Sequence, residues 1–179
     1  MIGSSLLIDQ TKGHSFNLDT VLLAKFLNLP SKIKNVLDIG TGNGALLLYV
    51  SQMSKAKLQG IEIQPFRFNL AKQNIKLNEL DDRTELILGD YLKTPYKDLD
   101  CIITNPPFFK TANENRMSND EGSKIARHEL DLSLEELIKK ASLDLKFGGY
   151  FYMVHRADRF AEIMRFLDRY HLTVKRVKF

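Results

Sequence analysis

An amide, two prolines and an aromatic ring stand in a row where an apolar stretch ends. The stretch is Cys101-Ile102-Ile103, and the four residues are Asn105, Pro106, Pro107 and Phe108. Consecutive prolines fix φ and remove two backbone donors, so a strand cannot continue through them. The amide oxygen and the freed carbonyls could accept from an amine on a flat group, and the ring could stack on that group. A proline-terminated strand with core aromatics explains the same residues, and the stretch alone leaves both interpretations open.

A glycine-rich loop is the second stretch that could do chemistry. Gly40, Gly42 and Gly44 alternate with other residues directly after Asp38-Ile39. Glycines let a ligand approach the backbone closely, and a helix start offers it N–H groups. The spacing G-x-G-x-G differs from the dinucleotide pattern G-x-G-x-x-G and from the phosphate pattern G-x-x-x-x-G-K-S/T. Because Asp38 precedes the loop and Asp19 lies upstream, the loop suits a cationic ligand better than a pyrophosphate.

Two further carboxylates follow apolar stretches. Glu62 lies 24 residues after Asp38, where an acid can accept from ribose hydroxyls. Asp90 follows Gly89 and could accept from an adenine amine. Singly, such acids are common as turn residues. Three of them at successive strand ends, beside a glycine loop, predict a site for a nucleoside joined to a cation, and S-adenosylmethionine is such a molecule.

Helical and strand patterns alternate along the whole chain and would position these residues. Pro65 stands at the favoured first position of a helix, and Ser133-Leu134-Glu135-Glu136 is a capping box. Strands separated by helical crossovers predict a doubly wound, parallel sheet, so the fold class is α/β with one domain over residues 1–179. We expect residues 1–30 to flank the ligand and the polar segment 110–127 to be a mobile loop. The predicted helices are 19–29, 45–53, 65–78, 134–146 and 158–170; the predicted strands are 35–40, 57–63, 84–89, 100–104, 150–154 and 172–179.

Composition excludes several classes of protein. The single cysteine rules out an internal disulfide framework, and no cysteine–histidine cluster has metal-ligand spacing, so we expect no metal. The longest apolar run, 45–50, is too short to span a bilayer, and the first residues lack the charged and apolar regions of a signal peptide. An apolar fraction of 44% with 27% charged residues is ordinary for a globular domain. We therefore expect a soluble, cytoplasmic protein.

Positive charge gathers in the last quarter of the chain. Residues 139–179 carry ten Lys and Arg against four Asp and Glu, a surplus of six, whereas the whole chain has a net charge of +4. The first 138 residues therefore come to −2. A basic region can bind a polyanion such as a nucleic acid, because phosphate contacts are its main source of affinity. The same asymmetry is also common in proteins that bind no nucleic acid.

Taken together, the motifs resemble those of the class I S-adenosylmethionine-dependent methyltransferases. The stretch Asn105-Pro106-Pro107-Phe108 matches the Asn/Asp/Ser-Pro-Pro-Tyr/Phe/Trp signature of those that methylate amino nitrogens. The resemblance implies the strand order 3-2-1-4-5-7-6, with the glycine loop and Asn105 facing each other where the order reverses. It also implies that Asn105 and the Pro106 carbonyl accept from the target amine while Phe108 stacks on the base. For the cofactor, it implies that Asp38, Gly40, Gly42 and Gly44 hold the methionine part, Glu62 the ribose and Asp90 the adenine.

A narrower resemblance runs along nearly the whole chain. The segments Phe16-Asn17-Leu18-Asp19, Ala126-Arg127-His128-Glu129 and Val154-His155-Arg156 look like a family of bacterial tRNA1(Val) (adenine-37-N6)-methyltransferases. This likeness implies that the segment ending at Asp19 flanks the cofactor and that His155 and Arg156 lie where the substrate approaches. Arg156 and Arg159 would contact phosphates, and Arg127 and His128 are further candidates for RNA contacts, although His128 fits a structural role equally well. The chain stops at Phe179, after the predicted sixth strand, so the seventh strand of the class is not accounted for.

The sequence thus predicts an S-adenosylmethionine-dependent enzyme that methylates N6 of adenine in structured RNA, with the tRNA anticodon loop as the expected target. Methyltransferases of DNA adenine or of protein glutamine share the Asn-Pro-Pro stretch and are alternatives. A non-catalytic RNA-binding module or partner subunit that has kept the fold is another alternative. The glycine spacing disfavours a dinucleotide oxidoreductase. The sequence does not indicate the oligomeric state.

Overall fold

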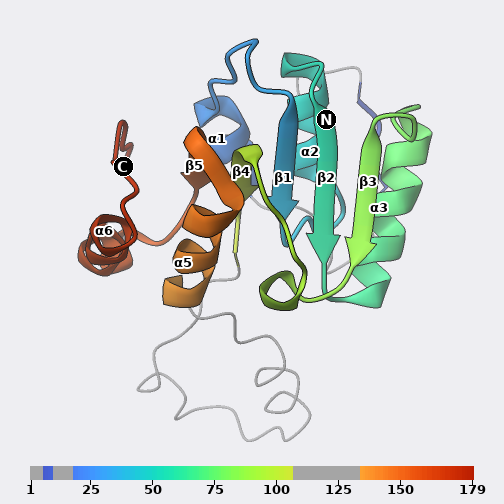
Figure 1. Ribbon diagram of the computed structural model, residues 1–179. Helices are drawn as coiled ribbons and strands as arrows, with labels where there is room; N and C mark the ends of the chain where they lie inside the picture. The colour runs from blue at the N-terminus through green and yellow to red at the C-terminus, as the bar shows by residue number, and fades with distance from the viewer. Residues whose placement is uncertain (1–5, 10–17, 107–133) are drawn as a thin grey trace, which may run out of the picture.

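A five-stranded parallel sheet forms the centre of the protein in the computed structural model, which describes residues 6–9, 18–106 and 134–179 (Figure 1). The strands lie in the order β3-β2-β1-β4-β5, so the order reverses between β1 and β4. The predicted α/β fold class and the start of the predicted strand order are confirmed. The strands are β1 (Asn35–Ile39), β2 (Lys57–Glu62), β3 (Thr84–Leu88), β4 (Leu99–Thr104) and β5 (Leu145–Met153).

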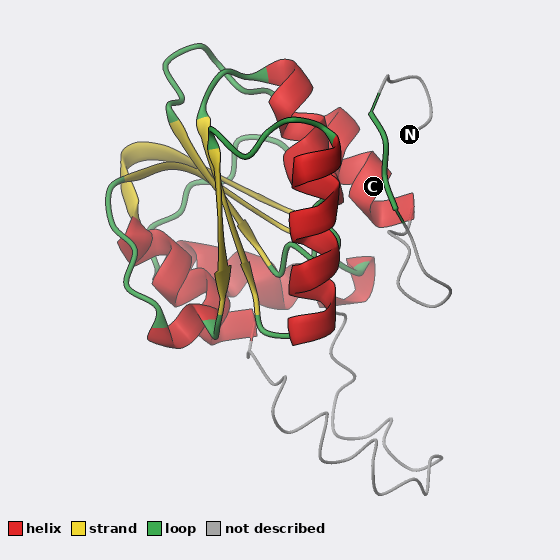
Figure 2. Ribbon diagram, turned by 90° about the vertical axis from the view of Figure 1, so that its right-hand side faces the viewer, coloured by secondary structure: helices red, strands yellow, loops and turns green. Residues whose placement is uncertain are grey.

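Helices cover both faces of the sheet (Figure 2). One core joins α1, α2 and α3 to side chains such as Val36 and Ile103, and a second joins α5 and η1 to the opposite side chains of the same strands, such as Leu37 and Ile102. Successive strand residues point to opposite faces, so a central strand covered on both sides must be apolar throughout. Every residue of β4 is indeed buried. The helices are α1 (Leu18–Phe26), α2 (Ala45–Met53), α3 (Pro65–Leu77), α5 (Leu134–Asp144) and α6 (Phe160–Arg169), with the 3₁₀ turns η1 (Tyr91–Lys93) and η3 (Ala157–Arg159).

The last two strands differ from the prediction. β5 begins at Leu145, five residues before the predicted start, and includes Gly148 and Gly149, just beyond the predicted end of the preceding helix at residue 146. Gly148 has φ of +74°, and the register between β4 and β5 shifts between Leu99 and Cys101. A glycine pair of this kind serves an irregular strand as well as a helix end, because glycine adopts positive φ without strain.

The predicted strand over residues 172–179 is wrong, because this segment forms no strand in the structure. It lies instead against helices: the Arg176 guanidinium stacks on the Phe26 ring at 4.0 Å and donates to the Phe26 carbonyl, and the Phe179 ring meets that of Phe160 at 5.2 Å. A strand needs a neighbour to complete its ladder. In the expected order 3-2-1-4-5-7-6, the neighbour of β5 is strand 7, so the sixth segment has no strand beside it.

Two of the expected segments cannot be compared with the structure. The loop predicted over residues 110–127 lies outside the described residues. Of the segment 1–30, residues 1–5 and 10–17 also lie outside them. None of the described helices has the length and apolar character needed to cross a membrane.

Candidate active site

The glycine loop and Asn105 leave the sheet side by side at its carboxyl edge. Ile39, the last residue of β1, pairs with Thr104, the last residue of β4, and the Thr104 hydroxyl donates to the Ile39 carbonyl at 3.0 Å. Gly40 and Asn105 are the next residues along the two strands. Since β1 and β4 are the strands between which the order reverses, the two motifs lie at the point where α/β sheets open for a ligand.

All three glycines of the loop have backbone angles that other residues rarely adopt. Their φ angles are +68° at Gly40, +59° at Gly42 and +83° at Gly44. A Cβ on Gly44 would make only ordinary van der Waals contact with Ala71 on α3, at 3.6 Å, so the requirement for glycine is conformational and not steric. The alternating glycines therefore meet a conformational requirement of the turn between β1 and α2, in which the Gly40 and Thr41 amides both donate to the Ile61 carbonyl.

Asp38 is a buried carboxylate with incomplete hydrogen bonding. Its side chain is 1% exposed, and Oδ2 accepts from the Thr41 hydroxyl at 2.8 Å, whereas Oδ1 has no hydrogen-bond partner among the described residues. Burial raises the pKa of Asp38 to about 8, with a further contribution from the Glu62 charge, although the Thr41 bond acts in the opposite direction. A carboxylate in this state gains strongly from a cationic donor placed against it.

Glu62 connects the end of β2 to the glycine loop. Its Oε2 accepts from the Gly42 amide and its Oε1 from the Gln64 amide, each at 2.9 Å, and the residue is 5% exposed. Each carboxylate oxygen has two lone pairs, so both oxygens can accept a second donor. Glu62 thus holds the loop in place and retains the capacity to accept from hydroxyl groups of a ligand.

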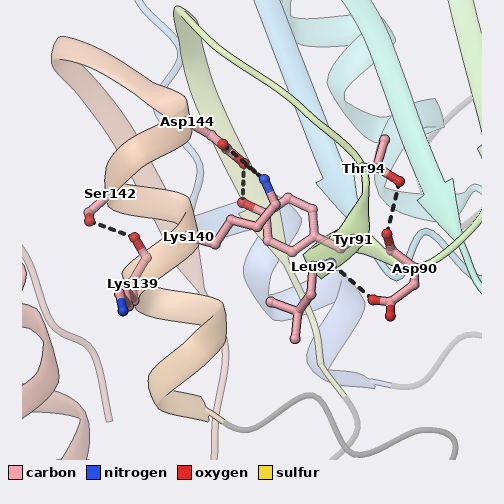
Figure 3. Close-up of polar contacts among 8 residues, drawn as sticks. All are labelled: Asp90, Tyr91, Leu92, Thr94, Lys139, Lys140, Ser142 and Asp144. Atoms are coloured by element: carbon pink, nitrogen blue, oxygen red, sulfur yellow. Dashed lines mark hydrogen bonds and ion pairs between the residues drawn. The ribbon is translucent and has the colours of Figure 1, made fainter.

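Asp90 caps the turn that follows β3 (Figure 3). Its Oδ1 accepts from the Leu92 amide at 2.9 Å, and its Oδ2 lies 3.3 Å from the Lys93 ammonium. The side chain is 28% exposed, so Asp90 remains reachable from the solvent side of the turn.

A buried polar cluster fixes this turn to α5. The Tyr91 hydroxyl donates to Asp144 Oδ2 at 2.7 Å, and the Lys140 ammonium pairs with the same carboxylate at 2.8 Å. Figure 3 shows the Lys140 side chain lying along the Tyr91 ring, and its ammonium is 4.7 Å from the ring centroid. Because Asp90 directly precedes Tyr91, this cluster limits the movement of Asp90.

The amide of Asn105 is held by α1. Its Nδ2 donates to the Thr20 hydroxyl at 3.0 Å, and Thr20 is 7% exposed. Asp19, the preceding residue, lies in the first turn of α1, so the structure brings this predicted residue near the Asn-Pro-Pro stretch. Pro106 is buried, and Pro107 and Phe108 lie outside the described residues.

The candidate RNA-binding residues after β5 form ion pairs with nearby acids. Arg156 makes two contacts to the Asp158 carboxylate, at 3.1 and 2.5 Å, and Arg159 pairs with Glu162. The backbone amide of Arg156 donates to His155 Nδ1 at 2.9 Å, and partial burial followed by the Arg159 charge lowers the pKa of His155. Arg127 and His128 lie outside the described residues. An RNA role for these four residues and Arg159 stays a prediction.

Two hydroxyl residues of the site were missed in the sequence. Thr41 lies three residues after Asp38, a spacing at which a hydroxyl reaches back to a carboxylate, and this signal was available. Thr20 contacts Asn105 across 85 residues of sequence, and only its position beside Asp19 pointed to it. Within the described residues, no group of three His, Cys, Asp or Glu side chains could hold a metal ion.

Several known proteins that are similar to this chain in sequence share the same name. The chain is 34% identical over 151 residues to a tRNA1(Val) (adenine(37)-N6)-methyltransferase of Porphyromonas gingivalis. The match covers 80% of this chain and 58% of the relative. It is 32% identical to a protein of the same name from Aliivibrio salmonicida, covering 90% of this chain and 69% of the relative. The chain therefore spans about three fifths of the length of the first of these relatives.

Solved structures share the fold at lower identity. A precorrin-6y C5,15-methyltransferase of Geobacter metallireducens superposes with a TM-score of 0.66 at 15% identity, over 92% of this chain and 77% of that one. A ribosomal protein L11 methylase of Lactobacillus delbrueckii subsp. bulgaricus gives 0.62 at 18% identity, over 85% and 66%. The family model described as "Methyltransferase small domain" matches residues 15–179. Since this match spans most of the chain, the protein belongs to the methyltransferase small domain family.

Proposed function

We propose that the protein is an S-adenosylmethionine-dependent methyltransferase that acts on N6 of adenine in tRNA. The observation that carries the proposal is the pairing of two features on adjacent strands. Asp38, a buried carboxylate with one oxygen that has no partner among the described residues, lies beside a glycine turn at the end of β1. An amide followed by proline, Asn105-Pro106, begins at the same level on β4. The first feature suits a cationic donor, and the second suits an amine acceptor.

The residues present fit the cofactor. The ammonium of its amino acid part would complete the hydrogen bonding of Asp38 Oδ1, which is otherwise buried and unsatisfied. Glu62 keeps lone pairs available for ribose hydroxyls, and Asp90, which stays partly exposed, would accept from the adenine amine. When bound, the cofactor supplies an electrophilic methyl group on a sulfonium.

The chain's own residues then act by positioning. Asn105 and the Pro106 carbonyl would accept from the target amine, so that its lone pair faces the methyl group. Thr20 supports this by holding the Asn105 amide, which keeps the acceptor in one orientation. The amine held in this way would take the methyl group that the bound cofactor supplies, leaving the cofactor as a thioether, and its proton would pass to solvent. Holding both reactants in line removes a large entropic part of the barrier, so no covalent help from the protein is required.

Two observations and one physical argument support an adenine in tRNA as the acceptor. The relatives named above are tRNA1(Val) (adenine(37)-N6)-methyltransferases. Residues 139–179 carry a positive surplus that suits a polyanion. An enzyme of this kind must reach a base that is unpaired or turned out of its stack, and loops are where RNA bases are exposed in this way.

The test is transfer of a labelled methyl group from S-adenosylmethionine into purified tRNA, DNA and protein, followed by analysis of the labelled nucleosides. We expect N6-methyladenosine in tRNA alone, formed about 100-fold more slowly when Asn105→Ala replaces the wild type. Label in DNA or on glutamine would move the proposal to those substrates. Binding of the cofactor and of tRNA without any transfer would indicate a non-catalytic role.

A further inference from the structure

Asn74 on α3 and Asn78, which caps the C-terminal end of α3, hold the first described residues of the chain. Asn78 Nδ2 donates to the Leu7 carbonyl at 2.7 Å, and Asn78 Oδ1 accepts from the Leu7 amide at 3.0 Å. One turn earlier, Asn74 Nδ2 donates to the Asp9 carbonyl at 3.1 Å, and Asn74 Oδ1 accepts from the Asp9 amide at 2.6 Å. Each asparagine thus makes both possible backbone bonds to one residue of the segment 6–9.

The spacing of the two asparagines matches an extended chain. Four residues along an α-helix advance by about 6 Å, and two residues along an extended chain advance by about 6.6 Å. Asn74 and Asn78 therefore meet alternate residues, Asp9 and Leu7, as a neighbouring strand would. The side chains of Leu7 and Asp9 are exposed, whereas those of Leu6 and Ile8 pack into the core that includes Ile75 of α3. The segment is therefore held by backbone hydrogen bonds on one side and by apolar contacts on the other.

Asn74 also reaches the glycine loop. Its Nδ2 donates a second hydrogen bond, of 2.9 Å, to the carbonyl of Asn43, and the Asn74 residue is 0% exposed. Asn43 precedes Gly44 and accepts through its own Oδ1 from Ala45 at the start of α2, at 3.3 Å. The amide of Asn74 is thereby used at both hydrogens and at its oxygen, and it ties the loop and the segment 6–9 to one point on α3.

We infer that Asn74 is a positioning residue that couples the docking of residues 6–9 to the binding of S-adenosylmethionine at the glycine loop; the inference rests on the proposed function. When the segment leaves, the Asn74 amide keeps the Asn43 carbonyl but loses both of its partners on Asp9, so its side chain can reorient and fixes the Asn43 carbonyl less firmly. The loop would then lose part of its rigidity, and rigidity is what a preformed binding site contributes to affinity.

The inference is tested with a matched pair of variants at position 9. Asp9→Pro removes the N–H that Asn74 accepts, whereas Asp9→Ala keeps it, and both remove the exposed carboxylate. We expect Asp9→Pro to raise the Kd for S-adenosylmethionine by about 5- to 10-fold, the effect of one hydrogen bond, and Asp9→Ala to keep the wild-type value. Calorimetry on the full chain measures both. Equal Kd values for the two variants, beside normal binding by the wild type, would overturn the inference alone.

A second measurement needs no variant and separates coupling from a structural role. Because linkage is reciprocal, S-adenosylmethionine must strengthen the docking of the segment by the factor with which docking strengthens its binding. Hydrogen exchange at the Leu7 and Asp9 amides of the wild type should therefore slow by about 5- to 10-fold when the cofactor is added. Unchanged exchange with the cofactor bound would overturn the inference. Absence of any cofactor binding to the wild type would instead overturn the proposed function, and this inference with it.

Discussion

The pH dependence of cofactor binding follows from the state of Asp38. Its pKa is about 8 in the ligand-free protein because burial disfavours the charged form. An ammonium placed against Oδ1 requires the ionised carboxyl, so a proton must leave Asp38 when the cofactor binds below pH 8. About one carboxyl in ten is ionised at pH 7 and about one in a hundred at pH 6, so the Kd should rise about tenfold per pH unit on the acid side.

Calorimetry in buffers with different ionisation enthalpies measures this proton directly. At pH 7 the wild type should release about 0.9 proton per bound cofactor, and the release should vanish in Asp38→Asn. The Asn variant should bind weakly, with a Kd that does not vary between pH 6 and 7.5, because the titrating group has been removed. A wild-type Kd that is flat over this range, or an equal slope in Asp38→Asn, would refute the assignment of the cationic group to Asp38.

The same carboxylate affects the stability of the ligand-free protein, with a definite sign. The folded pKa of Asp38 is raised, so this group favours the folded state at low pH, and its contribution is lost as the pH rises from about 4 to 8. An unperturbed Asp carboxyl has a pKa of about 3.9, whereas burial raises the pKa of Asp38 to about 8, so ionisation in the buried site costs up to about 6 kcal/mol at pH 8 and above. Urea denaturation at pH 8 should therefore show that Asp38→Asn is more stable than the wild type, while at pH 4 the two should be similar.

Other substitutions probe the acceptor side, the η1 support and the basic region. Asn105→Ala should lower kcat by about 100-fold and leave the cofactor Kd unchanged, which steady-state kinetics and calorimetry check; an equal loss in both would contradict a role at the target amine. Lys140→Met should destabilise the protein by about 3 kcal/mol in urea denaturation, because Asp144 would remain buried without its cation, and Ser142→Ala on the same helix is the control. Arg156→Ala should raise the KM for tRNA by a few fold, more at low salt than at high salt, and leave cofactor binding unaltered; an effect independent of salt would argue against a phosphate contact.

The sheet could be predicted well from the sequence because strands that are buried on both faces contain continuous apolar runs. The strand predicted over 100–104 contains the apolar run Cys101-Ile102-Ile103, and the structure buries all of β4. The helix over 45–53 has the predicted bounds because glycine ends the loop before it and its apolar residues face the core. The prediction failed where the structure of a segment depends on its neighbours in space. Residues 172–179 have a strand-like composition, but among the described residues no strand lies beside them, and they pack on α1 and α6 instead.

The candidate site divides in the same way. The positions of Asp38, Glu62 and Asp90 could be predicted because each lies at or just beyond the carboxyl end of a strand, and parallel strands bring their carboxyl ends to one edge. The contacts of Thr20 and Asn74 could not be predicted, because they join residues 85 and 65 positions apart through side-chain geometry. No local pattern encodes such a pair, and it becomes visible only when α1 and α3 are in place.

The structure also shows why the structural and functional readings of the strand-end acids do not exclude each other. Glu62 anchors the glycine loop through the Gly42 amide, and Asp90 caps η1, so each acid stabilises a turn in the ligand-free protein. A substitution of either residue would disturb the turn as well as any ligand contact, and a loss of binding would not distinguish the two roles. Asp38 differs, because its Oδ1 is buried and contacts no donor among the described residues, so the fold gains nothing from that oxygen and bears the cost of burying it. A buried polar group that does not stabilise the fold is typical of a binding site. For this reason, the proton released at Asp38 is the most direct measure of whether this edge of the sheet binds a cationic cofactor.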